Sequence, residues 1–252
     1  MTITESTTVA DIASSHPSSV RLFQQHGIDF CCGGKTALAL ACQQQGVPFA
    51  DLVNAIEAST QHAAPDDRDW TAEPLHALID HIVATYHDPL REELPRLELM
   101  AAKVSRVHGG KAPHLTRVDA IVSDLSADLR AHMQKEETAL FPAIRMIDRG
   151  HGQPSLPLAA PIGVMEAEHD DAGALLSELR TITGGYVAPA WACQTFRALY
   201  HGLSELESAM HVHVHLENNI LFPRALAGRE GARHGQEAQR DLHTEALRHR
   251  KV

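Results

Sequence analysis

The chain has 252 residues and a formal net charge of −10 at pH 7, with 44% hydrophobic but only 4% aromatic residues. This length suits one large domain or two smaller ones, and the negative charge argues against nucleic acid or an anionic membrane as a partner. No apolar run approaches the roughly 18 residues of a transmembrane helix, and the first residues lack the features of a signal peptide. We therefore expect a cytoplasmic protein with a helical core.

Residues 1–58 have the pattern of a small helical domain. Apolar residues are spaced for short helices that break near Pro17, and a glycine-bearing turn with two adjacent thiols follows within residues 26–35. Further helices are expected over residues 37–45 and from Pro48 onward. Because about sixty residues bury only a marginal core by themselves, we expect this domain to pack against the rest of the chain or against a partner.

Residues 59–70 are polar and include a proline, as expected of a linker between domains. Residues 71–228 show the periodicity of four long amphipathic helices, which predicts an all-α protein whose main domain is an up-down four-helix bundle. Residues 229–252 are polar and charged, and we expect them to form a poorly ordered tail. The four helices are expected at about 74–108, 113–147, 164–183 and 191–227, with a loop over 150–163 and kinks at Pro89 and Pro95.

A duplicated motif is the strongest chemical signal in the chain. His132 and Glu136 stand four residues apart and are followed by Leu-Phe-Pro, and the same pattern recurs at His213 and Glu217. In an α-helix, residues i and i+4 lie about 40° apart on one face. Each copy therefore directs an imidazole and a carboxylate to the same place, and these are ligand types of iron and zinc. The Leu-Phe-Pro runs are expected to serve in core packing and helix shaping.

A His-Asp pair precedes each copy, at His87 and at His169. Each half of the bundle therefore supplies one His from its first helix and a His plus a Glu from its second, as in two-metal sites built from facing helices. Two imidazoles for each metal and two carboxylates free to bridge favour iron over zinc, which normally takes four ligands. His108 has no counterpart in the second half; if it binds, one metal has three imidazoles and the other two.

Neighbouring groups are expected to play other parts. His211 and His215 lie about 160° around the helix from His213, so they should face away from it. Glu137 is one residue off the face shared by the ligands, and we expect it to be solvated or in a salt bridge. His76 and His81 are expected at the core edge or on the surface.

Cys31 and Cys32 are adjacent in the chain, and their α-carbons, about 3.8 Å apart, are too close for an unstrained disulfide. They are either two buried structural cysteines or a thiol pair that meets a metal, a partner thiol or nitric oxide. Lys35 would favour the thiolate form. Cys42 and Cys193 are expected to be ordinary packing residues.

Together these motifs resemble a known family. The bundle is similar to the hemerythrin-like proteins, and the chain up to about residue 229 resembles the iron–sulfur cluster repair di-iron proteins of the YtfE/ScdA type. The resemblance includes the Cys-Cys turn of residues 30–35. It implies a non-haem centre of two iron ions, bridged by carboxylates and an oxo group. The implied ligands are His87, His108, His132, Glu136, His169, His213 and Glu217.

The resemblance implies repair of iron–sulfur clusters damaged by nitrosative or oxidative stress, with the damaged iron–sulfur proteins as partners. In this hypothesis the centre gives up iron or binds nitric oxide. Cys31 and Cys32 then deliver iron to the damaged client protein or accept nitric oxide from it. Two alternatives stay open: a carrier or sensor of nitric oxide or dioxygen, and reduction of nitric oxide to nitrous oxide. Whether the chain is an enzyme is therefore undecided, and the sequence leaves the client, the reductant and a homodimer equally open.

Overall fold

A computed structural model describes residues 2–60, 68–149 and 157–228. These residues form helices, and their only β-type pairing is an isolated antiparallel bridge between Thr8 and Ala37, so the predicted all-α class is confirmed. No helix in the described parts combines the length and the apolar character needed to cross a membrane. The predicted tail lies outside the described residues, as do residues 61–67 of the expected linker and 150–156 of the expected loop.

Four short helices form the N-terminal part of the fold. Thr8 caps the first by accepting a hydrogen bond from the backbone N–H of Asp11. Gly27 and Gly46 end the second and third in the left-handed conformation, with φ of 65° and 66°. Apolar side chains from these helices enclose a core of their own. The helices are α1 (Val9–Ser15), α2 (Ser19–His26), α3 (Leu38–Gln45) and α4 (Phe49–Thr60).

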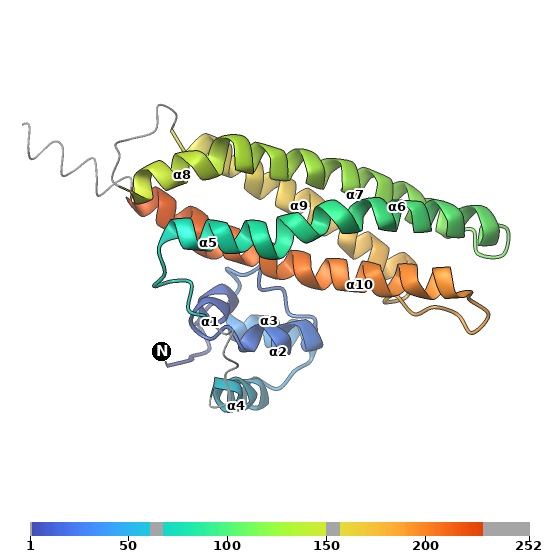
Figure 1. The fold of residues 1–252 in the computed structure, drawn as a ribbon. Helices are drawn as coiled ribbons and strands as arrows, with labels where there is room; N and C mark the ends of the chain where they lie inside the picture. Colours follow the sequence, from blue (N-terminus) through green and yellow to red (C-terminus); the bar gives the residue numbers. More distant parts are fainter. Residues whose placement is uncertain (1, 61–67, 150–156, 229–252) are drawn as a thin grey trace, which may run out of the picture.

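Four long helical segments alternate in direction and form the predicted up-down bundle (Figure 1). The third segment begins at Ala159, earlier than expected, because Pro161 falls in its first turn, where a missing N–H is tolerated. After the last segment the helical backbone continues to residue 228. The segments are α5 (Leu75–Ile82), η1 (Val83–His87) and α6 (Asp88–His108); α7 (Leu115–Lys135), η2 (Glu136–Leu140) and α8 (Phe141–Asp148); α9 (Ala159–Ile182); and α10 (Gln194–His215) and η3 (Leu216–Leu221).

The three η segments are π-helical turns, and each ends two residues before a proline. A proline has no N–H, and its ring clashes with the carbonyl of residue i−4. The helix widens at these points, and the N–H that follows each segment bonds to the carbonyl five residues earlier. The kink expected at Pro89 takes this form, whereas Pro95 lies inside an unbroken α6. Each π-turn carries one of the predicted ligands, namely His87, Glu136 and Glu217.

The bundle core consists of two apolar clusters with a polar layer between them. One cluster fills the end formed by α5, α8 and η3, and includes Ile79 and Phe222. The other fills the end formed by α6, α7, α9 and α10, and includes Val118 and Leu179. Buried histidines and glutamates lie where the two clusters meet.

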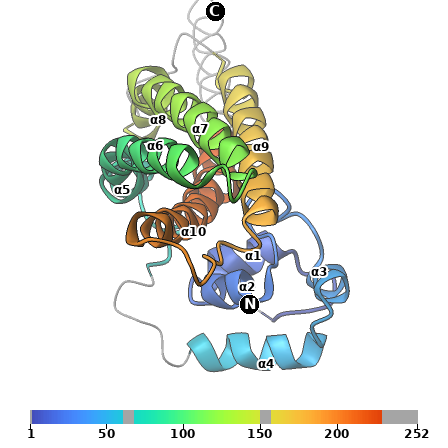
Figure 2. The ribbon, with the colours of Figure 1, turned by 90° about the vertical axis from the view of Figure 1, so that its right-hand side faces the viewer.

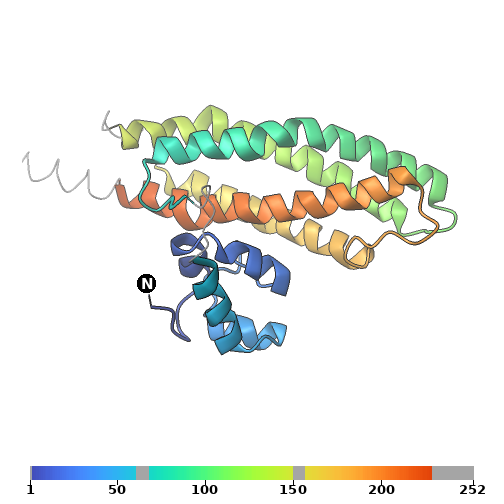
Figure 3. The same ribbon diagram turned by 60° about the horizontal axis from the view of Figure 1, so that its bottom comes forward.

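The N-terminal helices pack against the bundle, with α1 against η3 and α4 on the side away from it (Figures 2 and 3). Asn219 Nδ2 donates to the backbone oxygens of Phe30 (3.3 Å) and Cys31 (3.1 Å). Nδ1 of His215 lies 3.1 Å from the same Phe30 oxygen. The Phe30 ring is buried and meets His211 and His215 edge-on. These contacts satisfy the expectation that the small domain packs on the rest of the chain.

Replacing Asn219 with alanine should loosen this contact. The change removes two hydrogen bonds, each worth about 0.5–1.5 kcal/mol, so the undocked population should rise about tenfold. Cys31, which is 7% exposed, should then react faster with iodoacetamide, as measured by peptide mass spectrometry. Asn54→Ala, at an exposed position on α4, is the matched control. Equal Cys31 labelling in the two variants would contradict a docking role for Asn219.

Candidate metal centre

Six of the seven predicted ligands converge in the polar layer of the bundle, where each side chain is at most 3% exposed. All four long helical segments contribute, and two of them bring both a His and a Glu. The geometry therefore joins the two copies of the duplicated motif into one cluster. Its members are His87, His132, Glu136, His169, His213 and Glu217.

The four imidazoles form two pairs, and each pair joins two different helices. Nε2 of His87 lies 3.2 Å from Nε2 of His213, and Nε2 of His132 lies 3.0 Å from Nε2 of His169. His132 and His169 each use Nδ1 for another contact, so their facing Nε2 atoms carry no hydrogen when the rings are neutral. Two ring nitrogens presented in this way suit a common cation, because a neutral imidazole nitrogen is a metal ligand.

Glu136 and Glu217 lie between the two pairs. Glu217 directs Oε1 to His213 and Oε2 to His169, both at 3.1 Å. Oε2 of Glu136 lies 3.4 Å from Nε2 of His87 and 3.3 Å from Nε2 of His132. Each imidazole pair and the two glutamates together place their ligand atoms within 4.8 Å of one another. Two groups of donors that share both carboxylates form the pattern of two metal ions with carboxylate bridges.

The two carboxylates are buried without hydrogen bonds from the described residues, at all four oxygens. Burial, together with the negative charge of Glu217, raises the pKa of Glu136 above its usual value. Burial alone would also raise the pKa of Glu217, but the adjacent His213 outweighs it and brings that pKa well below the usual value. Buried oxygens without hydrogen bonds, next to the Nε2 atoms of the imidazoles, fit a site for cations.

Three of the four imidazoles are oriented by a second contact at Nδ1, which leaves Nε2 for a metal. The three contacts are similar in length. Glu137 and Glu168 are in turn paired with Arg91 and Lys135, respectively. The contacts are His87–Glu137 Oε1 (2.7 Å), His132–Glu168 Oε2 (2.8 Å) and His169–Asn218 Oδ1 (2.8 Å).

His213 differs from the other three, since its Nδ1 has no partner among the described residues. Its ring instead stacks on Tyr86, with centroids 5.4 Å apart and planes within 5°. The salt bridge expected for Glu137 is confirmed, but its part in orienting His87 was missed from the sequence. The available signal was an acidic residue directly beside a ligand, Glu137 after Glu136 and Glu168 before His169.

His108 does not reach the six-residue cluster. Helix α6 runs unbroken to His108, and its 21 residues place that residue about 30 Å from His87 at 1.5 Å per residue. There Nε2 of His108 lies 3.2 Å from Sγ of Cys193. The expected asymmetry of three imidazoles against two therefore has no counterpart in this geometry. The exposed Cys193 is likewise no ordinary packing residue.

Four other histidines, His76, His81, His211 and His215, lie where the sequence predicts them. His211 and His215 face the N-terminal helices and contact Phe30. His76 pairs with Asp148, and His81 stacks on Trp70 at the edge of the bundle.

The thiol turn lies where the N-terminal helices meet the bundle. Cys32 packs on α9, with Sγ 3.9 Å from the backbone oxygen of the ligand candidate His169. The Cys31 thiol lies 3.2 Å from Oδ1 of Asp29, whose two oxygens also accept the backbone N–H groups of Cys31 and Gly33 at 2.9 Å. Gly34 allows the turn, because a Cβ there would lie 2.7 Å from the Phe30 oxygen.

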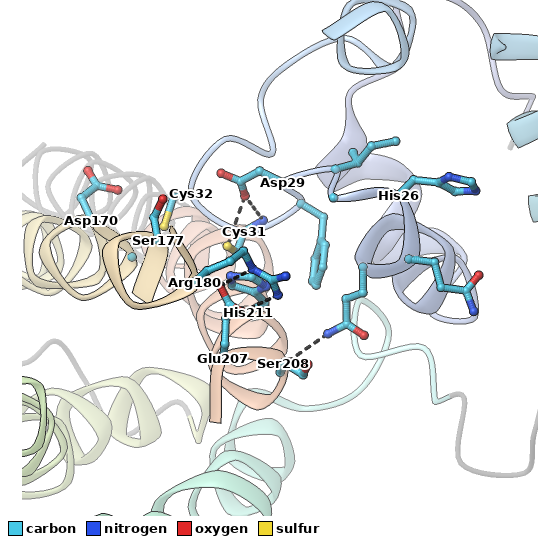
Figure 4. A pocket seen from close by; sticks show the side chains of 16 residues that line it. His26, Asp29, Cys31, Cys32, Asp170, Ser177, Arg180, Glu207, Ser208 and His211 are labelled. Atoms are coloured by element: carbon cyan, nitrogen blue, oxygen red, sulfur yellow. Dashed lines mark hydrogen bonds and ion pairs between the residues drawn. The ribbon is translucent and has the colours of Figure 1, made fainter. Parts of the chain in front are cut away.

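Cys31 and Cys32 are free thiols and line a cavity of about 610 Å³ between the N-terminal helices and the bundle (Figure 4). The hydrogen bond with Cys32, followed by burial, raises the pKa of Cys31 far above its usual value. Lys35, which was expected to favour a thiolate, is exposed, and the charged group that contacts Cys31 is Asp29. The docked turn therefore holds Cys31 as a neutral thiol.

Comparison with known proteins identifies the bundle. Residues 78–225 match the family described as the hemerythrin HHE cation binding domain. The chain belongs to the hemerythrin HHE family. Residues 5–60 match a second family, described as a domain of unknown function (DUF542). Three similar proteins, from Salmonella paratyphi B, Salmonella newport and Salmonella heidelberg, are named "Iron-sulfur cluster repair protein YtfE". Each is 43% identical to this chain over 223 residues, which cover 87% of this chain and 96% of the relative.

Glu217→Gln should remove most of the metal from this hemerythrin-family bundle, because one carboxylate oxygen is needed toward each imidazole pair. We expect fewer than one divalent ion per chain, against two in the parent, by elemental analysis after anaerobic loading with ferrous iron. Glu205→Gln, at an exposed position on α10, is the control. Full metal content in Glu217→Gln would exclude Glu217 as a ligand.

Glu137→Gln should weaken metal binding and leave its stoichiometry intact. A neutral amide holds His87 less firmly and makes its imidazole a weaker donor, an effect of about 10- to 100-fold on affinity at similar positions. Competition with a chelator of known affinity measures the change, and Glu92→Gln, at an exposed site on α6, provides the comparison. An unaltered affinity in Glu137→Gln would show that the contact does not support the site.

Proposed function

We propose that this chain repairs damaged iron–sulfur clusters with iron held at the six-residue cluster. The observation that carries the proposal is the arrangement of two imidazole pairs that share Glu136 and Glu217. This cluster lies beside a turn with two free thiols. The 43% identical relatives, which are named iron–sulfur cluster repair proteins, support the same function.

The donor set favours two iron ions as the metal. His87 and His213 would hold one ion, and His132 and His169 the other, with the two glutamates as bridges. Two imidazoles and shared carboxylates suit iron, whereas structural zinc sites close with four separate ligands. Iron bound there would supply the cargo from which a damaged cluster is rebuilt.

The thiol turn provides the second half of the proposal. In the docked position Asp29 and Cys32 keep Cys31 in its neutral form, and Asn219 holds the turn against the bundle. Release of the Asn219 contact would expose both thiols to solvent and remove the cost of burying a thiolate. Thiolates are good ligands for iron, so the released turn could pass iron to a client protein while the docked turn covers the centre.

The competing functions use the same centre but leave the turn unexplained. A carrier or sensor of nitric oxide or dioxygen needs a metal centre and an entry path, and it has no need of two cysteines beside them. Damaged iron–sulfur proteins are therefore the proposed partners, and a cytoplasmic location stays a prediction from the sequence.

Iron-loaded parent protein should restore the activity of a [4Fe–4S] enzyme inactivated with nitric oxide, and should do so faster than an equal amount of free ferrous iron. Cys31→Ser/Cys32→Ser should keep its iron but lose at least about tenfold in recovery rate, because a serine hydroxyl is a far poorer iron ligand than a thiolate. Cys193→Ser, far from the centre, should match the parent.

Four other results would change the conclusion. Recovery no faster than with free iron would end the repair proposal, and full recovery with the double serine variant would remove the thiols from it. Reversible nitric oxide binding without iron release would instead indicate a carrier or sensor. Nitrous oxide in the headspace would indicate a reductase.

A further inference from the structure

The end of the bundle far from the six-residue cluster brings Cys193 and His108 together. Nε2 of His108 lies 3.2 Å from Sγ of Cys193, and the thiol is exposed. Trp191 and Phe196 flank the imidazole, with ring centroids 5.8 and 5.7 Å away. A nucleophile and a base within hydrogen-bond reach form the arrangement by which proteins activate a cysteine. The proposed repair function uses neither residue.

Both residues stand at the ends of long helices whose dipoles act in opposite senses. Cys193 is the N-cap of α10, a helix of 22 residues, and His108 is the last residue of α6, a helix of 21 residues. A helix N-terminus favours a negative charge and a C-terminus favours a positive one. The Cys193 thiol therefore lies at the helix end that favours negative charge, and the His108 imidazole at the end that favours positive charge.

Two further cations lie beside this pair. Nζ of Lys111 is 4.1 Å from the centroid of the Trp191 ring. The Arg197 guanidinium donates to the backbone oxygens of Ala190 (2.8 Å) and Ala192 (3.1 Å). In the described parts of the chain, the ion pairs of Lys and Arg with carboxylates do not include Lys111 or Arg197. The surroundings of the thiol are thus positive and suit an anionic reagent.

We propose that Cys193 and His108 form a thiol modification site that reacts with anionic low-molecular-weight disulfides of the glutathione type. His108 accepts the proton of Cys193 as its sulfur attacks one sulfur of the reagent. The reagent's S–S bond breaks, a new S–S bond joins Cys193 to one half, and the other half leaves as a thiolate that takes the proton from His108. Cys193 is oxidised and the leaving half is reduced, and a second thiol reverses the reaction.

Two of the other three cysteines, Cys31 and Cys42, are less suited to this reaction. Cys42 is 2% exposed and Cys31 is 7% exposed, and burial raises the pKa of Cys42. Cys193 is therefore expected to react ahead of both. Its distance from the six-residue cluster, most of the length of α6, means that modification there leaves the candidate metal ligands unaltered.

Oxidised glutathione and the uncharged 2-hydroxyethyl disulfide, each added to the full metal-loaded chain, test the proposal. The tryptic peptide of residues 181–197 contains Cys193 and no other cysteine, so mass spectrometry follows its modification directly. His108→Gln should slow both reagents about tenfold at pH 7 and move the rise of the rate to higher pH. Lys111→Gln should slow only oxidised glutathione. His114→Gln is the matched control, since that imidazole pairs with Tyr200 (3.0 Å) at the same end of the bundle.

An unchanged rate and pH profile in His108→Gln would overturn the proposal. A second comparison covers the case in which that variant does not fold: Cys193 in the parent should react faster at pH 6 than the same cysteine in a synthetic peptide of residues 181–197. Equal rates there would also overturn it. Elemental analysis of each variant should show the parent's metal content, so failure of this proposal is separate from failure of the repair function.

Discussion

Two carboxylates buried at the centre of the bundle are the constraint on which the rest of the structure depends. An uncompensated ion in a protein interior costs several kcal/mol even after relaxation, and Glu136 and Glu217 lie side by side without a hydrogen-bond donor among the described residues. Apolar clusters close the bundle on both sides of them, so solvent cannot screen the charge. Four imidazoles surround the carboxylates, and acidic residues orient two of them. Two cations bound among these groups would neutralise the buried carboxylates.

The π-turns allow one helix to serve several partners at once. In η3, three consecutive residues have three different tasks: Glu217 joins the imidazole pairs, Asn218 orients His169, and Asn219 holds the thiol turn. The proline two residues beyond each π-turn ties this geometry to the local sequence. The candidate ligand Glu217 and the residue that holds the thiol turn, Asn219, therefore lie two positions apart on one backbone segment.

The sequence was sufficient to predict the bundle and the six candidate ligands that converge in it, because helical periodicity and the i, i+4 spacing are local properties. The resemblance implies His108 as a ligand, whereas the length of α6 places it about 30 Å from His87. Tertiary contacts were not predictable in the same way. The pairing of His87 with His213, the docking of Phe30 on α10 and the contact of His108 with Cys193 join residues far apart in the chain.

The imidazole pairs cross between the two halves of the duplicated sequence. His87 from the first half pairs with His213 from the second, and His132 from the first pairs with His169 from the second. Each ion would therefore bind one imidazole from each half of the duplicated sequence, and neither half alone contains a complete imidazole pair. Loss of one ion would therefore leave the other still linking the two halves of the sequence.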